Sequence, residues 1–166
     1  MHRILFICHG NICRSTMAQF VFADLVTRAG RDGEFVIDSA ATSREEIGNP
    51  PHRGTVRKLR EVNVPVLEHR ARQVMREEYE SWDLIVYMDS NNERNLLRLL
   101  GGDPQGKCRK LMSFAGSGRD VADPWYTGDF DATYRDVLAG CKGLLASIDD
   151  GTFTFGQPSE VPIIRP

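Results

Sequence analysis

A buried strand, a polar turn and a helix follow one another at the start of the chain, and this pattern constrains the fold more than any other feature. The apolar run at residues 4–7 predicts a strand over residues 3–8. Apolar residues at helical spacing predict a helix over residues 16–29, in which Thr16 and Gln19 match a capping box. A short turn between such elements is typical of a parallel α/β fold. The turn itself reads Cys8-His9-Gly10-Asn11-Ile12-Cys13-Arg14-Ser15.

The residue types in this octet suit an anion-binding turn. A helix N-terminus offers unpaired N–H groups, and Gly10 and Asn11 tolerate the left-handed backbone of a tight turn. Arg14 supplies a planar guanidinium that can hold two phosphate oxygens. A positive field favours the thiolate form of cysteine, so Cys8 is the candidate nucleophile and Ser15 a hydroxyl donor to it. Taken alone, Cys8 could equally be a core cysteine, but the whole octet favours a site for a phosphoryl dianion.

The rest of the chain reads as one α/β domain in which strands alternate with helices. A polar loop with two prolines occupies residues 40–51, and Cys141 lies on the apolar stripe of the last helix. We assign residues 1–150 to the domain and residues 151–166 to a C-terminal tail. The expected strands cover residues 34–39, 83–89 and 108–114, the last of them at a sheet edge, and the expected helices cover residues 52–62, 91–100 and 130–148.

Composition argues against several classes of protein. The net charge of -2 gives no reason to expect nucleic acid or an anionic membrane surface as a partner. The apolar runs are too short to span a bilayer, and no signal-peptide pattern opens the sequence. The four cysteines are scattered without a zinc-type spacing, which indicates a reducing, cytoplasmic setting. We expect neither a metal nor a cofactor.

A second loop, at residues 121–126, offers the acid that phosphoryl chemistry needs. Cleavage of an aryl phosphate requires a proton for the departing oxygen, and Asp123 is the candidate general acid. Pro124 biases Asp123 toward an extended conformation, while Trp125 and Tyr126 can flank an aromatic ring. The alternative is an ordinary Asp-Pro turn whose two aromatics cover an edge of the core.

Together these motifs resemble the low-molecular-weight protein tyrosine phosphatase family. The resemblance implies an open parallel sheet of four strands in the order 2-1-3-4, with helices on both faces. It also implies hydrolysis of phosphotyrosine and small aryl phosphates through a phosphocysteine on Cys8, with Arg14 binding phosphate and Asp123 as general acid and base. The stretches that carry it are the octet, the run Asp38-Ser39-Ala40-Ala41-Thr42-Ser43, the run Gly48-Asn49-Pro50-Pro51, and the loop around Asp123.

The resemblance assigns roles to further residues. Ser39 and His69 would support Asn11 and so hold residues 8–15, the phosphate loop, in shape. Cys13 would trap oxidised Cys8 as a reversible disulfide, although it could instead simply fill space behind the loop. The implied substrate-binding residues are His9, Gly10, Asn11, Ile12, Cys13, Ser15, Trp125 and Tyr126. Arg70 and Arg72, which flank Ala71, read as a solvated face.

Three positions depart from the family's pattern. Glu45 stands where an aromatic residue often lies, Trp125 where tyrosine is more usual, and Thr16 where a proline usually starts the helix. Without an aromatic at position 45, Trp125 and Tyr126 remain as the walls for a substrate ring. A proline-free helix start is expected to be tolerated.

Three other functions fit the same kind of scaffold. A thiol-dependent arsenate reductase would need two further cysteines after the third strand, and residues 83–107 contain none. A phosphoarginine phosphatase is a closer variant, but the apolar Ile12 suits an aromatic substrate better. A non-catalytic phosphate-binding module would need Arg14 without Cys8 and Asp123. Expected partners are phosphotyrosine proteins, with a bacterial tyrosine kinase as one candidate, and the chain is expected to be a monomer or a weak dimer.

Overall fold

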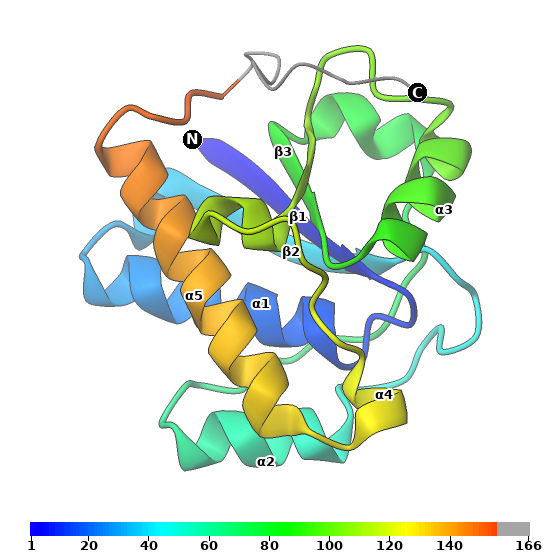
Figure 1. Cartoon of the computed structure of the whole chain (residues 1–166), viewed down its shortest axis with the longest axis vertical. Coiled ribbons are helices and arrows are strands. Elements are labelled where there is room, and N and C mark those ends of the chain that lie inside the picture. The colour runs from blue at the N-terminus through cyan, green and yellow to red at the C-terminus, as the bar shows by residue number, and fades with distance from the viewer. Residues whose placement is uncertain (156–166) are drawn as a thin grey trace.

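Four parallel strands form the centre of the molecule (Figure 1). The structure is a computed structural model and describes residues 1–155. The strands are β1 (His2–Cys8), β2 (Phe35–Ala41), β3 (Leu84–Tyr87) and β4 (Cys108–Lys110), and they lie in the order β2-β1-β3-β4. The predicted α/β class and the order 2-1-3-4 are therefore confirmed. Because the chain passes from β1 to one side and later returns to the other, the carboxyl end of β1 is the switch point where such sheets bind ligands.

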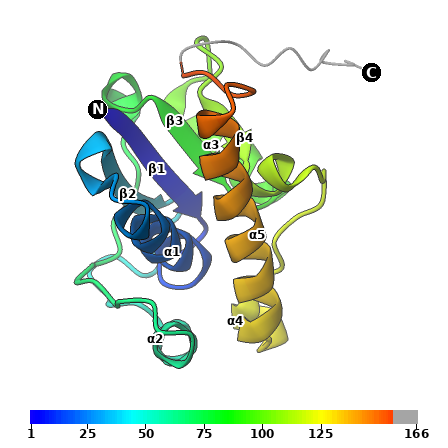
Figure 2. The same ribbon diagram turned by 90° about the vertical axis from the view of Figure 1, so that its left-hand side faces the viewer.

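Helices cover both faces of this sheet. Helices α1 and α5 pack together on one face, while α3 lies on the other (Figures 1 and 2). The α-helices are α1 (Arg14–Arg28), α2 (Arg53–Glu61), α3 (Ser90–Leu100), α4 (Pro124–Thr127) and α5 (Phe130–Asp149), and the 3-10 helices are η1 (Asp32–Glu34), η2 (Arg76–Ser81) and η3 (Leu111–Ala115). No helix among the described residues is long and apolar enough to cross a membrane.

The uninterrupted apolar run of β1 is explained by burial on both faces. Ile4 and Phe6 belong to the core under α1 and α5, whereas Leu5 and Ile7 belong to the core under α3. All four side chains are fully buried. A strand covered on both faces carries apolar residues at every position instead of alternating with polar ones. This double burial fixes β1 firmly and sets the starting point of the loop that follows it.

The capping box predicted for the first helix is wrong. Helix α1 begins at Arg14, and Cys13 precedes it without a side-chain cap bond. The Thr16 hydroxyl instead donates to the Cys13 carbonyl at 3.1 Å, and Gln19 accepts a hydrogen bond from the Ser39 hydroxyl. Since the Cys13 side chain makes no cap bond to this helix start, the N–H groups there remain suited to an anion.

The strand predicted over residues 108–114 is wrong beyond Lys110. The chain turns into η3, which buries the neighbouring side chains of Leu111 and Met112 together. A strand would point these two residues to opposite faces. The turn packs tightly on α5, where a Cβ atom added at Gly143 would collide with the Phe114 carbonyl oxygen. Glycine at that position therefore permits the close approach that ends the strand.

The first residues of the predicted tail pack against the sheet. Phe155 stacks on His2 with ring centroids 4.2 Å apart, and Phe153 meets Phe114 edge to face at 5.5 Å. Both phenylalanines are partly buried against the main core. The remainder of the tail prediction, residues 156–166, lies outside the described residues.

Candidate active site

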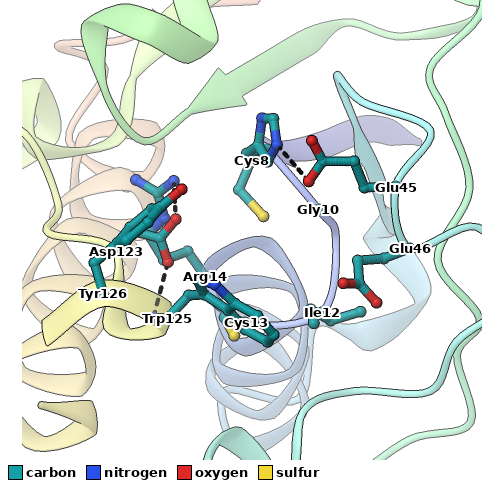
Figure 3. Close-up of a pocket in the computed structure, with 11 residues that line it drawn as sticks. Cys8, Gly10, Ile12, Cys13, Arg14, Glu45, Glu46, Asp123, Trp125 and Tyr126 are labelled. Carbon is teal, nitrogen blue, oxygen red and sulfur yellow. Dashed lines mark hydrogen bonds and ion pairs between the residues drawn. The ribbon is translucent and has the colours of Figure 1, made fainter. Parts of the chain in front are cut away.

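The loop between β1 and α1 lies at the carboxyl end of the central strand (Figures 1 and 3). Asn11 occupies the left-handed region with φ of 61°. Asparagine tolerates this conformation better than most residues other than glycine. The resulting turn brings the chain back on itself, so that backbone and side-chain donors converge on the sulfur of Cys8.

Two polar groups face the Cys8 sulfur. The Asn11 N–H donates to Sγ at 3.3 Å, and Ser15 Oγ lies 3.0 Å from it. Ser15 Oγ also accepts a hydrogen bond from the Asn11 side-chain amide at 2.7 Å. As a thiol, Cys8 donates to Ser15 Oγ, and once the sulfur is a thiolate the serine hydroxyl can donate to it instead. Donors to a sulfur stabilise its negative form, which is the nucleophilic one.

The Asn11 side chain joins the phosphate loop to two other segments. Its amide nitrogen donates to Ser39 at 2.9 Å, and its oxygen accepts from His69 Nε2 at 2.7 Å and from the Arg72 backbone N–H at 3.3 Å. A backbone N–H can only donate, so the Arg72 contact fixes which atom of the amide is the oxygen. Ser39 and His69, both predicted to support the loop, are thus in direct contact with Asn11.

His69 is a neutral hydrogen-bond donor in this network. Its side chain is only 7% exposed, and burial lowers its pKa, although the carboxylate of Asp38 opposes the shift. Since Nε2 faces the oxygen of Asn11, that nitrogen carries the proton. The arrangement fits a positioning group and offers no free nitrogen to the pocket.

The prediction that Arg72 belongs to a solvated face is wrong. Its guanidinium is half-buried and pairs with Asp38 at 3.1 Å and with Glu78 at 3.0 Å. Burial alone would lower the pKa of Arg72, but these carboxylates raise it. The ion pairs hold the segment whose backbone contacts Asn11. Arg70, by contrast, is exposed and donates to the Gly48 carbonyl at 3.3 Å.

Arg14 is a buried cation that links three parts of the chain. Its guanidinium bonds Asp89 at 2.6 Å and the Val121 carbonyl at 2.9 Å, and it lies 3.4 Å from Asp123. Burial would lower the pKa of Arg14, but the charge of Cys8 and the hydrogen bond to Asp89 raise it. A buried arginine needs such a partner, because an unpaired buried charge is strongly destabilising.

Asp89 is a functional residue that the sequence reading missed. Asp89 caps α3, since one of its carboxylate oxygens accepts a hydrogen bond from the Asn92 N–H at 2.7 Å. The other oxygen takes Arg14. Asp89 follows the carboxyl end of β3, which lies next to β1 in the sheet, and that position was the signal that could have placed it near the phosphate loop.

Residues 121–126, the acid loop, approach Arg14 from the side of the pocket that faces Glu45 and Glu46 (Figure 3). Asp123 caps the short helix α4, accepting from the Trp125 N–H at 3.1 Å. Trp125 and Tyr126 are 58% and 82% exposed, so they form an open wall rather than a core edge. Trp125 contacts the ring of His52 edge to face, with centroids 5.8 Å apart.

One pocket brings most of these groups together. Asn11 and Ser15, which are also predicted to bind substrate, have fully buried side chains that do not line the pocket. Glu46 is a wall residue that the sequence reading did not single out. The lining comprises Cys8, His9, Gly10, Ile12, Cys13, Arg14, Glu45, Glu46, Asp123, Trp125 and Tyr126.

Cys13 also lines the pocket and is a free thiol in this structure. Burial raises its pKa to about 12, with the charges of Cys8 and Asp123 adding to the effect. It is therefore a protonated thiol at neutral pH, unlike a nucleophilic cysteine. This geometry leaves both predicted roles open, as a spacer and as a redox partner.

A cysteine, five residues, an arginine and a serine between a central parallel strand and a helix define the class of cysteine-dependent phosphatases. A sequence model of the low molecular weight phosphotyrosine protein phosphatase family matches residues 3–152. The chain is 38% identical over 150 residues to the low molecular weight protein-tyrosine-phosphatase YfkJ of Bacillus subtilis, covering 89% of this chain and 96% of the relative. It is 36% identical over 149 residues to the low molecular weight phosphotyrosine protein phosphatase of Rattus norvegicus, covering 86% and 92%.

Structural similarity agrees with these matches. The crystal structure of YfkJ from Bacillus subtilis superposes with a TM-score of 0.87 at 37% identity, covering 92% of this chain and 98% of that one. The chain belongs to the low molecular weight protein-tyrosine phosphatase family, whose members are hydrolases that act on phosphoproteins.

Proposed function

We propose that this protein hydrolyses phosphotyrosine in proteins, and small aryl phosphates, through a phosphocysteine on Cys8. The observation that carries the proposal is the meeting of Cys8, Arg14 and Asp123 in one pocket. Arg14 and the loop N–H groups bind the phosphoryl oxygens and stabilise the charge that develops on them. Ser15 steadies the thiolate through its hydroxyl.

The reaction proceeds in two displacements. The sulfur lone pair of Cys8 attacks phosphorus, the phosphorus–oxygen bond breaks, and the proton of Asp123 passes to the departing phenolate. Water then attacks the phosphocysteine, Asp123 takes a proton from that water, and the sulfur–phosphorus bond breaks to release phosphate. Asp123 already lines the same pocket as Cys8 and lies 3.4 Å from the Arg14 guanidinium.

The alternatives find less support in the geometry. A relay of oxidation needs two further cysteines near Cys8. Cys13 lines the pocket, but Cys141 is fully buried in the core and Cys108 lies on the edge strand β4. A pure phosphate binder would have no use for an acid beside the thiol. The apolar Ile12 in the pocket lining suits an aryl group better than phosphoarginine.

Rapid mixing with p-nitrophenyl phosphate tests the proposal. We expect a burst of one phenol equivalent per chain. We expect Cys8→Ser to abolish the burst and to lower the turnover rate by at least about 10³-fold. Cys108→Ser is the matched control, a cysteine outside the pocket, and should retain the burst. Near-normal turnover by Cys8→Ser would contradict the scheme. Faster release of phosphate from a phosphoarginine peptide than from a phosphotyrosine peptide would favour the phosphoarginine alternative.

The wider setting is also proposed. Phosphotyrosine proteins, with a bacterial tyrosine kinase among the candidates, are the expected substrates, and the protein is expected to act in the cytoplasm as a monomer or weak dimer without a cofactor. Residues 1–150 would form the catalytic domain and the following residues a tail.

A further inference from the structure

The pocket has two chemically different walls (Figure 3). Trp125 and Tyr126 provide aromatic surface on the side of the acid loop. On the other side lie two carboxylates, Glu45 and Glu46. The phosphate loop, with Cys8 and Arg14, lies between these walls. A substrate that places its phosphoryl group in the loop must therefore pass a carboxylate wall.

Glu46 is held in place by its surroundings. Its side chain packs on Gly10, where an added Cβ atom would lie 3.3 Å from Glu46 Cγ. Its carboxylate accepts a hydrogen bond from the Asn49 side-chain amide at 2.6 Å. Asn49 is in turn tied through its backbone to Ala71 at 2.9 Å. The position of this negative charge is thus set by the fold.

The charge of Glu46 is not neutralised within the described part of the chain. No lysine, arginine or histidine nitrogen there lies within 4.0 Å of its carboxylate. Arg44 belongs to the same loop but does not line the pocket. Glu45 does pair with His9 at 3.1 Å, yet both of these side chains are exposed, so the pair is weak and replaceable.

An unpaired carboxylate beside a phosphate site is unfavourable on its own. It repels the incoming dianion, and the repulsion is stronger where water is partly excluded. A cation on the substrate, placed next to the phosphoryl-bearing side chain, would turn this wall from repulsive to attractive. Substrates without such a cation would still pay the repulsion, which is how a charged wall discriminates between partners.

We infer that Glu46, assisted by Glu45, selects phosphotyrosine segments that carry a lysine or arginine next to the phosphotyrosine. The inference rests on the proposed function and specifies the substrate class of the same pocket. A preference for acidic flanking residues would instead arise from the side chains of Arg53, Arg57 and Arg60. These are exposed on α2 and have no partner among the described residues. They line a groove next to His52, outside the phosphate pocket, so the carboxylate wall is closer to the phosphoryl group.

Three phosphotyrosine peptides that differ only at the residues flanking the phosphotyrosine test the inference. The flanking residues are arginine, glutamine or glutamate, and kcat/KM is measured for each at low ionic strength. We expect the arginine peptide to exceed the glutamine peptide by about three- to fivefold, as for a partly exposed ion pair. The glutamate peptide is expected to be the poorest. Raising the salt to about 0.5 M should reduce the differences.

Variants of the carboxylate wall show which glutamate causes the preference for the arginine peptide. Glu46→Gln is expected to bring the arginine-to-glutamine ratio close to one, and Glu45→Gln to reduce it by a smaller factor. The ratio is taken within each variant, so a general loss of activity cancels. Glu77→Gln, an exposed glutamate on η2 away from the pocket, is the matched control and should keep the wild-type ratio.

The outcomes separate this inference from the proposed function. Turnover of all three peptides at equal rates, or an unchanged ratio in both Glu46→Gln and Glu45→Gln, would overturn the inference and leave the phosphatase proposal standing. A preference for the glutamate peptide would also overturn it and would point to the arginines of α2. No turnover of p-nitrophenyl phosphate or of any peptide would overturn the proposed function and this inference with it.

Discussion

The phosphate loop and the acid loop face one another across the pocket, but the protein holds them in different ways. Asn11, Ser15 and Ser39, which hold the phosphate loop, are fully buried. Trp125 and Tyr126 of the acid loop are mostly exposed. One side of the site is therefore determined by the core before any substrate arrives, whereas the other depends on few contacts. Stability and catalysis should be separable on the acid loop and inseparable in the phosphate loop.

The acid loop provides the largest expected effect. Asp123→Asn should lower kcat for aryl phosphates by about 10²–10³-fold, since it removes the transferable proton. Stability should change by less than about 1 kcal/mol, because asparagine still accepts the α4 cap bond from the Trp125 N–H and Arg14 keeps its bonds to Asp89 and the Val121 carbonyl. Steady-state rates across phenols of different basicity, together with urea unfolding, provide the measurement.

The leaving-group series is the internal control for that variant. Phenols that are poor leaving groups should be slowed most, because they depend most on protonation. Equal slowing across the series would contradict the acid role of Asp123. A large loss of stability would break the proposed contrast between the two loops.

The phosphate loop should respond in both properties at once. Asn11→Ala removes the hydrogen bonds to Ser15, Ser39 and His69 and leaves a non-glycine residue at φ of 61°. The free energy of unfolding should fall by about 2–4 kcal/mol, and kcat/KM should fall with it, because buried partners are left unsatisfied. Urea unfolding and steady-state kinetics on the same preparation measure the two effects.

Asn63 offers a matched control for the backbone contribution. It also has a left-handed conformation, with φ of 60°, but it is exposed in the turn that follows α2. Asn63→Ala should therefore cost only the strain, about 1 kcal/mol, and should leave kcat/KM unchanged. If both variants lost the same stability, the hydrogen-bond network around Asn11 would not be what holds the loop.

This contrast also explains how far the sequence could predict the site. The octet from Cys8 to Ser15 combines a strand end, a tight turn and a helix start, so its chemistry is readable from neighbouring residues. Asp89 and Glu46 are not readable in this way, since each acquires its role only when distant segments meet Arg14 or Gly10. The strand order 2-1-3-4 came from the family resemblance rather than from the residue pattern.

The errors share one physical cause, which is tertiary contact overriding a local preference. Residues 111–114 have strand-like composition but turn into η3 because α5 approaches closely at Gly143. Arg72 looks like a surface residue until Asp38 and Glu78 are placed beside it. Local patterns located most of the helices and strands to within two residues, whereas contacts between elements required the structure.

The smallest expected effect concerns the pH dependence of the phosphate loop's support. Burial lowers the pKa of His69 below its usual 6.5, so the unfolded chain binds a proton there more readily than the folded protein. The stability that this group contributes is therefore present above about pH 6.5 and is lost as the pH falls through the lowered folded pKa.

His69→Gln, which retains a donor for Asn11 but does not titrate, should lose less stability than the wild type between pH 7.5 and pH 5. Thermal unfolding at each pH gives the stability of the wild type and of His69→Gln, and the difference between their pH curves is the measurement. His9→Gln is the comparison variant, because it leaves the His69 contacts in place and should therefore keep the share of the pH dependence that His69 contributes. Parallel curves for wild type and His69→Gln would show that the buried imidazole does not link folding to protonation in this range.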